Sequence, residues 1–305
     1  MCITFFYIDR TPDAKLKFVM VHNREEDFAR PTLQLGQFEE DMNIYGGRDE
    51  KEQGTWLGFN AKTQNLAFLT NRFSWSIFKD RMVSKLNIFS KSSQQKTISR
   101  GKLIQEFIST DFFERYSFQN DENSTYNYAK TIFQNRNKFM PFNLLVANLK
   151  HMEFVFQGNY DKFPPVSLRD GYYTFCNFSS FESPIQKQVV GLNHFKELVQ
   201  QTISNLDDSN TATKIQKENE KGLIQNIHDI MENEQYQFTF SLLPMWNESK
   251  IFIKPYYSYF SRHYRGTRTS TVLILNDKNQ LTVSENTYHQ DTNIQKVNKQ
   301  YDIQL

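Results

Sequence analysis

The chain of 305 residues is 38% hydrophobic and 15% aromatic, which is enough apolar material for a packed core and excludes global disorder. Its 36 Lys and Arg residues nearly balance 34 Asp and Glu residues, leaving a formal charge of +2. A near-neutral chain gives no reason to expect nucleic acid or an anionic membrane surface as the main partner.

The two cysteines, Cys2 and Cys176, are too few for a disulfide framework, and no spacing of Cys and His residues indicates a zinc site. No apolar run approaches the roughly 18 residues of a transmembrane helix. The N-terminus also lacks the basic leader of a secretory signal. We therefore expect a protein that is not secreted, has no transmembrane segment and resides in a reducing compartment.

The N-terminal part of the sequence is typical of β structure. Residues 2–8 and 16–22 have the β-branched and aromatic content of strands, and the turn residues at 11–13 join them into a predicted hairpin. Residues 23–31 are a charged, polar bend ending in proline. The glycines that follow predict turns around Trp56, which is itself expected in the core.

Helices are predicted in the middle of the chain. A strand at residues 66–70 ends before a polar insertion at 72–99. Apolar residues at helical spacing then predict helices at 101–116 and 126–134. Strands are expected again at 142–148, 153–157 and 172–177.

The C-terminal part adds a helix that begins near Ser183-Pro184, because proline favours the first helical turn. A solvated linker is expected at 207–221, and a short helix at 223–231. Two late strands follow at 270–275 and 280–284. Strands at both ends with helices between them predict an α+β fold. We expect a single domain over residues 1–305, with polar insertions near 72–99 and 207–221.

Cys2 is the residue with the most distinctive chemistry. Once Met1 is removed, its thiol lies within a few bonds of its own α-amine, whose pKa near ~8 suits a general base. A nearby guanidinium would stabilise the thiolate, and amide side chains would donate hydrogen bonds to a developing oxyanion. This combination is one form of an activated nucleophile. The plain alternative is a small residue at a frayed chain end.

Eight segments along the chain carry a resemblance to a known family: MCITFFYIDR, HNREEDFARP, GGRDEKEQGTWLGF, LAFLTN, RGKLIQEF, FNLLVANL, DGYYTFCN and RGTRTSTVLIL. In this order they resemble the NRDE-domain family of transport and Golgi organisation 2 proteins, over residues 1–284. The naming motif Asn-Arg-Asp-Glu stands here at residues 23–26 as Asn-Arg-Glu-Glu. The family is similar to N-terminal-nucleophile hydrolases of the penicillin V acylase and bile-salt hydrolase kind.

That resemblance implies a four-layer αββα sandwich of two antiparallel sheets. It also implies five site residues: Cys2 as nucleophile, Arg24 beside the thiolate, Asn71 and Asn177 at the oxyanion site, and Arg268 close by. The acidic partner is either Glu25 or Asp27.

The residues themselves point partly the same way. Cys2 and Arg24 lie at the open end of one predicted hairpin, and Asn71 and Asn177 each end an apolar strand. Because side chains alternate along a strand, Cys176 is expected to point away from Asn177 and to pack in the core. A plainer interpretation of Arg24 is a surface ion pair with a neighbouring glutamate.

Three functions fit the sequence. The first is hydrolysis or acyl transfer on a non-peptide amide or thioester through a Cys2 acyl-enzyme, with no cofactor required. The second, implied by the resemblance, is a non-catalytic trafficking factor in the cytoplasm or mitochondrion, with haem or acyl-CoA as ligand, although no CxxCH motif for haem attachment is present. The third is an accessory structural subunit that docks a protein partner in a larger assembly.

Overall fold

The computed structural model describes residues 2–72, 98–117, 123–159, 163–179, 182–207, 213–232, 250–258, 261–290 and 296–305. The polar insertion expected at 72–99 lies almost wholly outside the described residues.

The N-terminal strand lies inside a seven-stranded antiparallel sheet, called sheet 1 below. Its strands are β1 (Ile3–Ile8), β2 (Leu16–Asp27), β10 (Gly171–Cys176), β11 (Tyr256–Ser258), β12 (His263–Asn276), β13 (Gln280–Tyr288) and β14 (Lys296–Gln304). The order is β10-β1-β2-β12-β13-β14, and β11 pairs with β12. Because β1 is paired on both sides, by β2 and β10, its position is fixed by two hydrogen-bond ladders.

A second seven-stranded antiparallel sheet, sheet 2, is a meander in which each strand pairs with the next one along the chain. Its strands are β3 (Thr32–Phe38), β4 (Asp41–Asp49), β5 (Leu57–Asn60), β6 (Asn65–Asn71), β7 (Phe142–Asn148), β8 (Glu153–Gly158) and β9 (Val166–Ser167). The chain between β6 and β7 contains the first group of helices, α2 (Gly101–Ile108), α3 (Phe112–Arg115) and α4 (Ser124–Gln134), with a short 3₁₀ turn at Arg136–Lys138.

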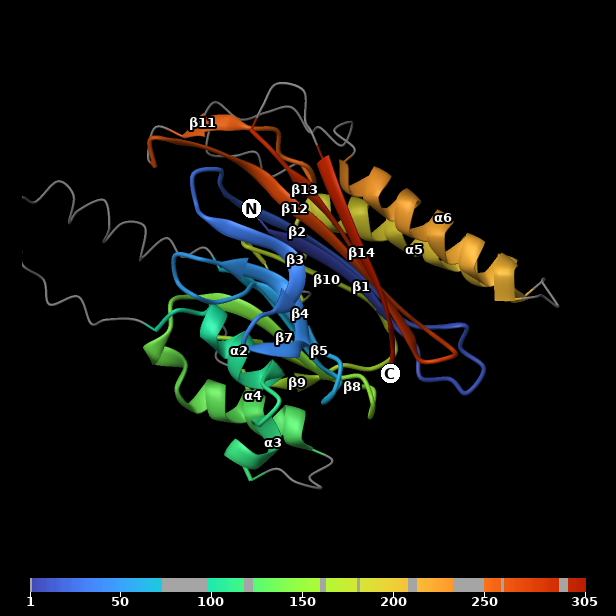
Figure 1. Cartoon of the computed structure of the whole chain (residues 1–305), viewed down its shortest axis with the longest axis horizontal. Coiled ribbons are helices and arrows are strands. Elements are labelled where there is room, and N and C mark those ends of the chain that lie inside the picture. The colour runs from blue at the N-terminus through green and yellow to red at the C-terminus, as the bar shows by residue number, and fades with distance from the viewer. Residues whose placement is uncertain are drawn as a thin grey trace, which may run out of the picture.

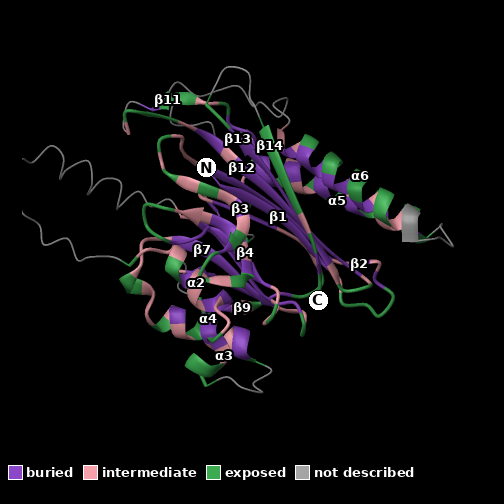
Figure 2. Ribbon diagram, in the orientation of Figure 1, coloured by how far each residue is buried: buried purple, intermediate pink, exposed green. Residues whose placement is uncertain are grey.

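The two sheets pack face to face, and helices cover both outer faces (Figure 1). The helices α5 (Gln186–Asp207) and α6 (Thr213–Glu232) lie on sheet 1, where they share an apolar cluster with Phe5 and Val21. The first helical group lies on sheet 2 around Phe107 and Tyr128. The inner core joins the two sheets (Figure 2). The predicted four-layer αββα sandwich is therefore confirmed.

Side chains alternate between the two faces of each strand, so a single strand contributes residues to two of the three apolar layers. In β1, Phe6 belongs to the core between the sheets, whereas Phe5 belongs to the layer under α5 and α6. All six residues of β1 are buried, as are all seven of β7. A strand buried on both faces appears as a continuous apolar run, which is why the predicted bounds of β7 are correct.

The charged bend predicted at 23–31 is wrong for its first half. The strand β2 continues to Asp27, because Asn23, Arg24 and Glu25 pair with β12 and are buried. Polar composition was the signal for a bend, but these polar residues lie on paired, buried strands. Of the segment 46–60, where turns were predicted, residues 50–53 form a turn, whereas Gly46 and Gly47 lie within β4 and residues 57–60 form β5.

The linker predicted at 207–221 is wrong over residues 213–221, because α6 begins at Thr213 and the short helix expected at 223–231 is its second half. Residues 208–212 lie outside the described residues. The polar first half of α6 is held by side-chain hydrogen bonds. Asn276 Nδ2 donates to Glu220 Oε1 at 3.0 Å, and Gln216 Nε2 donates to Asp277 Oδ1 at 3.0 Å. A helix can thus be polar and still be docked on a sheet.

Candidate active site

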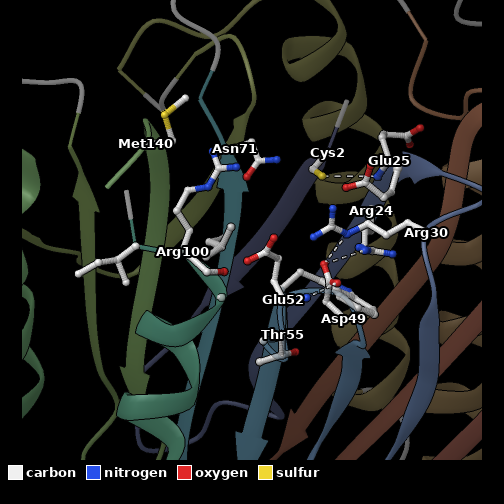
Figure 3. A pocket seen from close by; sticks show the side chains of 17 residues that line it. Cys2, Arg24, Glu25, Arg30, Asp49, Glu52, Thr55, Asn71, Arg100 and Met140 are labelled. Atoms are coloured by element: carbon white, nitrogen blue, oxygen red, sulfur yellow. Dashed lines mark hydrogen bonds and ion pairs between the residues drawn. The ribbon is translucent and has the colours of Figure 1, made fainter. Parts of the chain in front are cut away.

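A cavity of about 370 Å³ opens at the end of the sandwich where β1 begins and β6 ends. It is lined by the start of β1, the end of β2 and the turn after it, the β4–β5 connection, the end of β6, the start of α2 and the segment just before β7. Figure 3 shows side chains from both sheets, and that of Arg100 just before α2, directed into this space. Seven of its 17 lining residues carry acidic or basic side chains, so the cavity is strongly polar.

Cys2 forms one wall of the cavity and lies between two predicted site residues. Ile3 pairs with Asn23 on one side and with Cys176 on the other, so the preceding Cys2 lies next to Arg24 and Asn177. The Asn177 N–H donates to the Cys2 carbonyl at 3.3 Å. The Glu25 N–H donates to Cys2 Sγ at 3.4 Å.

Burial decides the ionisation of the Cys2 thiol. The residue is 6% exposed, and burial raises the pKa of the thiol above its ordinary value. The charge of the N-terminal amine, the backbone N–H of Glu25 and, least of the three, the charge of Arg24 act in the opposite direction. The thiol is therefore neutral at neutral pH and needs a base before it can act as a nucleophile.

Arg24 is a buried cation that reaches into the space between the sheets. It is 4% exposed, and its guanidinium lies over the ring of Trp56, with Cζ 4.0 Å from the ring centroid. Its Nη1 donates to Thr32 Oγ1 at 3.3 Å, and Nη2 lies 3.7 Å from Asp49 Oδ2. Burial lowers the pKa of this guanidinium. A surface ion pair with Glu25 or Glu26, the plainer interpretation, is thus not what the structure shows.

The structure separates the two acidic candidates. Glu25 lines the cavity, accepts a hydrogen bond from Thr267 Oγ1, and has a pKa that burial raises. Asp27 does not line it. Its Oδ1 instead accepts from Ser261 Oγ at 3.1 Å and lies 3.3 Å from Arg265 Nε. Of these two candidates, Glu25 is therefore the one that lines the cavity with Cys2.

Of the two predicted oxyanion amides, only Asn71 faces the cavity. Asn71 is the last residue of β6, and its amide points toward Cys2 (Figure 3). Asn177 follows β10 and contacts Cys2 through the backbone, but its side chain does not line the cavity. Its buried Oδ1 has no hydrogen-bond partner among the residues that the structure describes.

Arg268 lies behind the cavity rather than on its wall. It occupies a bulge in β12, between Thr267 and Thr269. Its Nη1 donates to the carbonyls of Asp27 and Arg30 at 2.9 Å each, so it holds the turn that carries Arg30. Burial, reinforced by the charge of Arg24, lowers the pKa of its guanidinium.

Several lining residues were missed by the sequence analysis. Asp49 Oδ2 accepts from Arg30 Nε at 2.7 Å and so bridges towards Arg24. Glu52 and Arg100 project from opposite sides of the cavity (Figure 3). The charges within GGRDEKEQGTW were a usable signal for Asp49 and Glu52. Arg100, some fifty residues later and at the start of a helix, gives no local signal.

Cys176 behaves as the sequence predicted, as a packing residue. It is fully buried in the layer between sheet 1 and α5, and its thiol donates to Gln188 Oε1 at 3.3 Å. Within the described ranges, no group of three or more His, Cys, Asp or Glu side chains is arranged to hold a metal ion. No helix in this part of the chain is both long and apolar enough to span a membrane.

The fold and the site together define an αββα protein of two antiparallel sheets, with a buried thiol, an arginine and a carboxyl gathered at one end. The model of the family "Transport and Golgi organisation 2" matches residues 1–290, and the chain belongs to this family.

Two relatives span nearly the whole chain. A Transport and Golgi organization protein 2 homolog of Bos taurus is 24% identical over 299 residues, covering 93% of this chain and 92% of its own. Transport and Golgi organization protein 2 of Drosophila melanogaster is 23% identical over 295 residues, covering 94% and 92%.

A solved structure also aligns with the chain. It is the Caenorhabditis elegans ortholog of N-acylethanolamine-hydrolyzing acid amidase, with 12% identity and a TM-score of 0.36. The alignment covers 89% of this chain and 92% of that one.

Proposed function

We propose that the protein hydrolyses or transfers the acyl group of a small amide or thioester through Cys2. The observation that carries this proposal is the placement of the Cys2 thiol in the wall of a polar cavity, beside a buried arginine and opposite the amide of Asn71. Family membership alone supports no activity, because function depends on the site rather than on the fold.

The chemistry requires Cys2 to be the first residue. Its free α-amine takes the thiol proton, and Sγ attacks the carbonyl carbon of the substrate. The C–N or C–S bond then breaks, and the leaving amine or thiol takes that proton. Water hydrolyses the thioester and restores the thiol. Asn71 supplies an amide N–H for the oxyanion, and Arg24 offsets the charge of the thiolate.

The size and lining of the cavity favour a small, polar substrate. At about 370 Å³ it lies at the lower end of ligand pockets, which span roughly 300–1,000 Å³. Its charged walls do not suit a long apolar chain. This argues for a compact acyl group rather than a fatty acyl chain or haem.

An activated ester tests the proposal. Protein shown by intact mass to lack Met1 is mixed with p-nitrophenyl acetate, and the release of p-nitrophenolate is followed. We expect a burst of about one equivalent, with an acetyl group on the peptide that begins with Cys2. The variant Cys2→Ala, which still permits removal of Met1, should lose both the burst and the acetyl group.

The second cysteine provides the matched control. Cys176→Ala removes a thiol of the same chemistry that lies outside the cavity, and it should keep the burst. Acetylation that persists in Cys2→Ala, or that is absent in correctly processed parent protein, would overturn the proposal.

A second candidate function is binding without reaction. It is favoured by the burial that raises the pKa of the Cys2 thiol, because a neutral thiol is a poor nucleophile. Under this alternative, short acyl-CoA molecules protect Cys2 from alkylation but are not cleaved. Protection without release of free CoA would support binding, and release of CoA would support the enzyme.

A further inference from the structure

Trp56 forms a floor beneath the guanidinium of Arg24. The two residues belong to different sheets: Arg24 lies on β2 of sheet 1, and Trp56 immediately precedes β5 of sheet 2. Trp56 is 6% exposed and is part of the core between the sheets. With Cζ 4.0 Å from its ring centroid, the contact is a desolvated cation–π pair at the wall of the cavity.

Two glycines in β4 explain how the indole comes to lie there. A Cβ on Gly47 would be 2.2 Å from Trp56 Cζ2 and Cη2, so only glycine lets the ring rest against the strand. A Cβ on Gly46 would be 2.6 Å from the Leu57 carbonyl, so glycine there lets β4 and β5 approach. These glycines, predicted from sequence to mark turns, lie within a strand and form a seat for Trp56.

Other contacts leave Arg24 incompletely held. Its hydrogen bond to Thr32 is 3.3 Å long, and its ion pair with Asp49 spans 3.7 Å, because Asp49 binds Arg30 more closely at 2.7 Å. The ring of Trp56 is therefore the packed surface that fixes where the guanidinium lies. Arg24 lies opposite Cys2 across the β1–β2 hairpin, because the neighbouring residues Ile3 and Asn23 are paired.

We propose that Trp56, seated on Gly47, is a positioning residue that holds the Arg24 guanidinium beside the Cys2 thiol. The inference rests on the role proposed for Cys2 above, and it identifies a function for the GGRDEKEQGTW segment. Without the ring, the long side chain of Arg24 is free to relax toward the carboxylates at the mouth of the cavity. The thiolate then loses the stabilising charge of this guanidinium.

The pH dependence of Cys2 alkylation by iodoacetamide tests this role without needing a substrate. The rate is measured on the peptide that carries Cys2, with the Cys176 peptide as an internal reference. Trp56→Leu changes no charge. The ionisable side chains that line the cavity with Cys2 therefore remain: Arg24, Glu25, Glu26, Arg30, Asp49, Glu52 and Arg100.

Arg24→Gln sets the scale of the effect. Loss of its charge should raise the midpoint of the alkylation profile by about half a pH unit or more, which lowers the rate below the midpoint at least threefold or so. Trp56→Leu should reproduce most of this shift. Trp56→Phe keeps an aromatic face and should restore the parent profile in large part.

Two controls separate positioning from loss of the core. Phe59→Leu removes another buried ring of the same core and should leave the midpoint unchanged. In the double variant Arg24→Gln with Trp56→Leu, the second substitution should add no further shift, because Trp56 acts only through Arg24.

The outcomes also separate this inference from the proposed function. Equal shifts in Trp56→Leu and Phe59→Leu, no shift in Arg24→Gln, or additive shifts in the double variant would each overturn the positioning role. If the shifts appear as expected but p-nitrophenyl acetate never acylates Cys2, positioning stands and the hydrolase proposal fails. If p-nitrophenyl acetate acylates Cys2 but Trp56→Leu leaves the alkylation profile unshifted, the hydrolase proposal stands and the positioning role fails.

Discussion

At the scale of single residues, two buried histidines make the protein sensitive to acid. His22 lies on the inner face of β2 near Phe68, and neither of its ring nitrogens has a hydrogen-bond partner among the described residues. Burial lowers its pKa to about 3. His228 on α6 has Nε2 3.3 Å from Ser284 Oγ, and burial lowers its pKa to about 4. Both are therefore neutral in the folded protein at physiological pH.

We expect the free energy of unfolding to fall as the pH drops from 7 to 5. Below about 6.5 the unfolded chain binds a proton at each histidine, whereas folded His22 stays neutral until the pH approaches 3. Each histidine should then cost about 2 kcal/mol over this range. Urea unfolding at pH 7 and pH 5 measures this loss of unfolding free energy, which should be smaller in His22→Leu than in the parent protein by that amount.

The carboxyls of Glu25 and Glu285 have pKa values raised by burial, so their effect on stability has the opposite sign. They are present in both the parent and His22→Leu, and the difference between the two proteins isolates the histidine. Parallel pH dependences would show that His22 is protonated, or exposed, in the folded state.

At the scale of elements, the two long helices differ in how closely they approach their surroundings. Gly191 in α5 packs against sheet 1, where an added Cβ would lie 2.3 Å from Phe5 Cζ and 2.8 Å from Ile251 Cδ1. Gly222 in α6 is exposed, and an added Cβ would meet nothing within 4 Å. The first glycine allows close contact, and the second only weakens its helix.

The same substitution should thus have opposite effects in the two helices. Gly222→Ala should raise the free energy of unfolding by roughly 0.5–1 kcal/mol, because alanine restricts the unfolded chain and favours the helix. Gly191→Ala should lower it by about 1–3 kcal/mol through overpacking against Phe5. Denaturant unfolding of both variants measures the two shifts. Destabilisation by Gly222→Ala would mean that residues 213–222 are not helical in solution.

At the scale of the whole molecule, aromatic packing between the sheets holds the layers together. Phe68 of sheet 2 contacts Phe6 and Phe175 of sheet 1, with ring centroids 5.8 Å and 5.7 Å away. Phe68 is fully buried in the inner core. Because both sheets depend on this core, and each helical layer depends on its sheet, the four layers should unfold together.

Removing one ring from this core should destabilise the entire sandwich. Phe68→Ala should cost about 3–5 kcal/mol, whereas Phe163→Ala, which removes a ring that is 64% exposed, should change stability by about 0.5 kcal/mol or less. Circular dichroism in the far and near ultraviolet should report the same midpoint in each protein. Separate transitions for helices and aromatic core would contradict a single cooperative unit.

Local pattern was enough to predict much of the framework of this protein. Continuous apolar runs predicted β1 and β7, because strands buried on both faces need apolar residues at every position. The short hairpin between β1 and β2 placed Cys2 next to Arg24, since pairing register follows from the turn. The order of short motifs predicted the family and, through it, the four layers.

Only the tertiary structure decided how the site is assembled. The choice of Glu25 over Asp27, the setting of Arg24 on Trp56, and the position of Arg100 at the N-cap of α2 depend on how two sheets and a helix meet. The extension of α6 through a polar segment likewise depends on docking to Asn276. Sequence periodicity reports which face of an element is buried, whereas these contacts join residues distant in the chain, and no local pattern encodes their geometry.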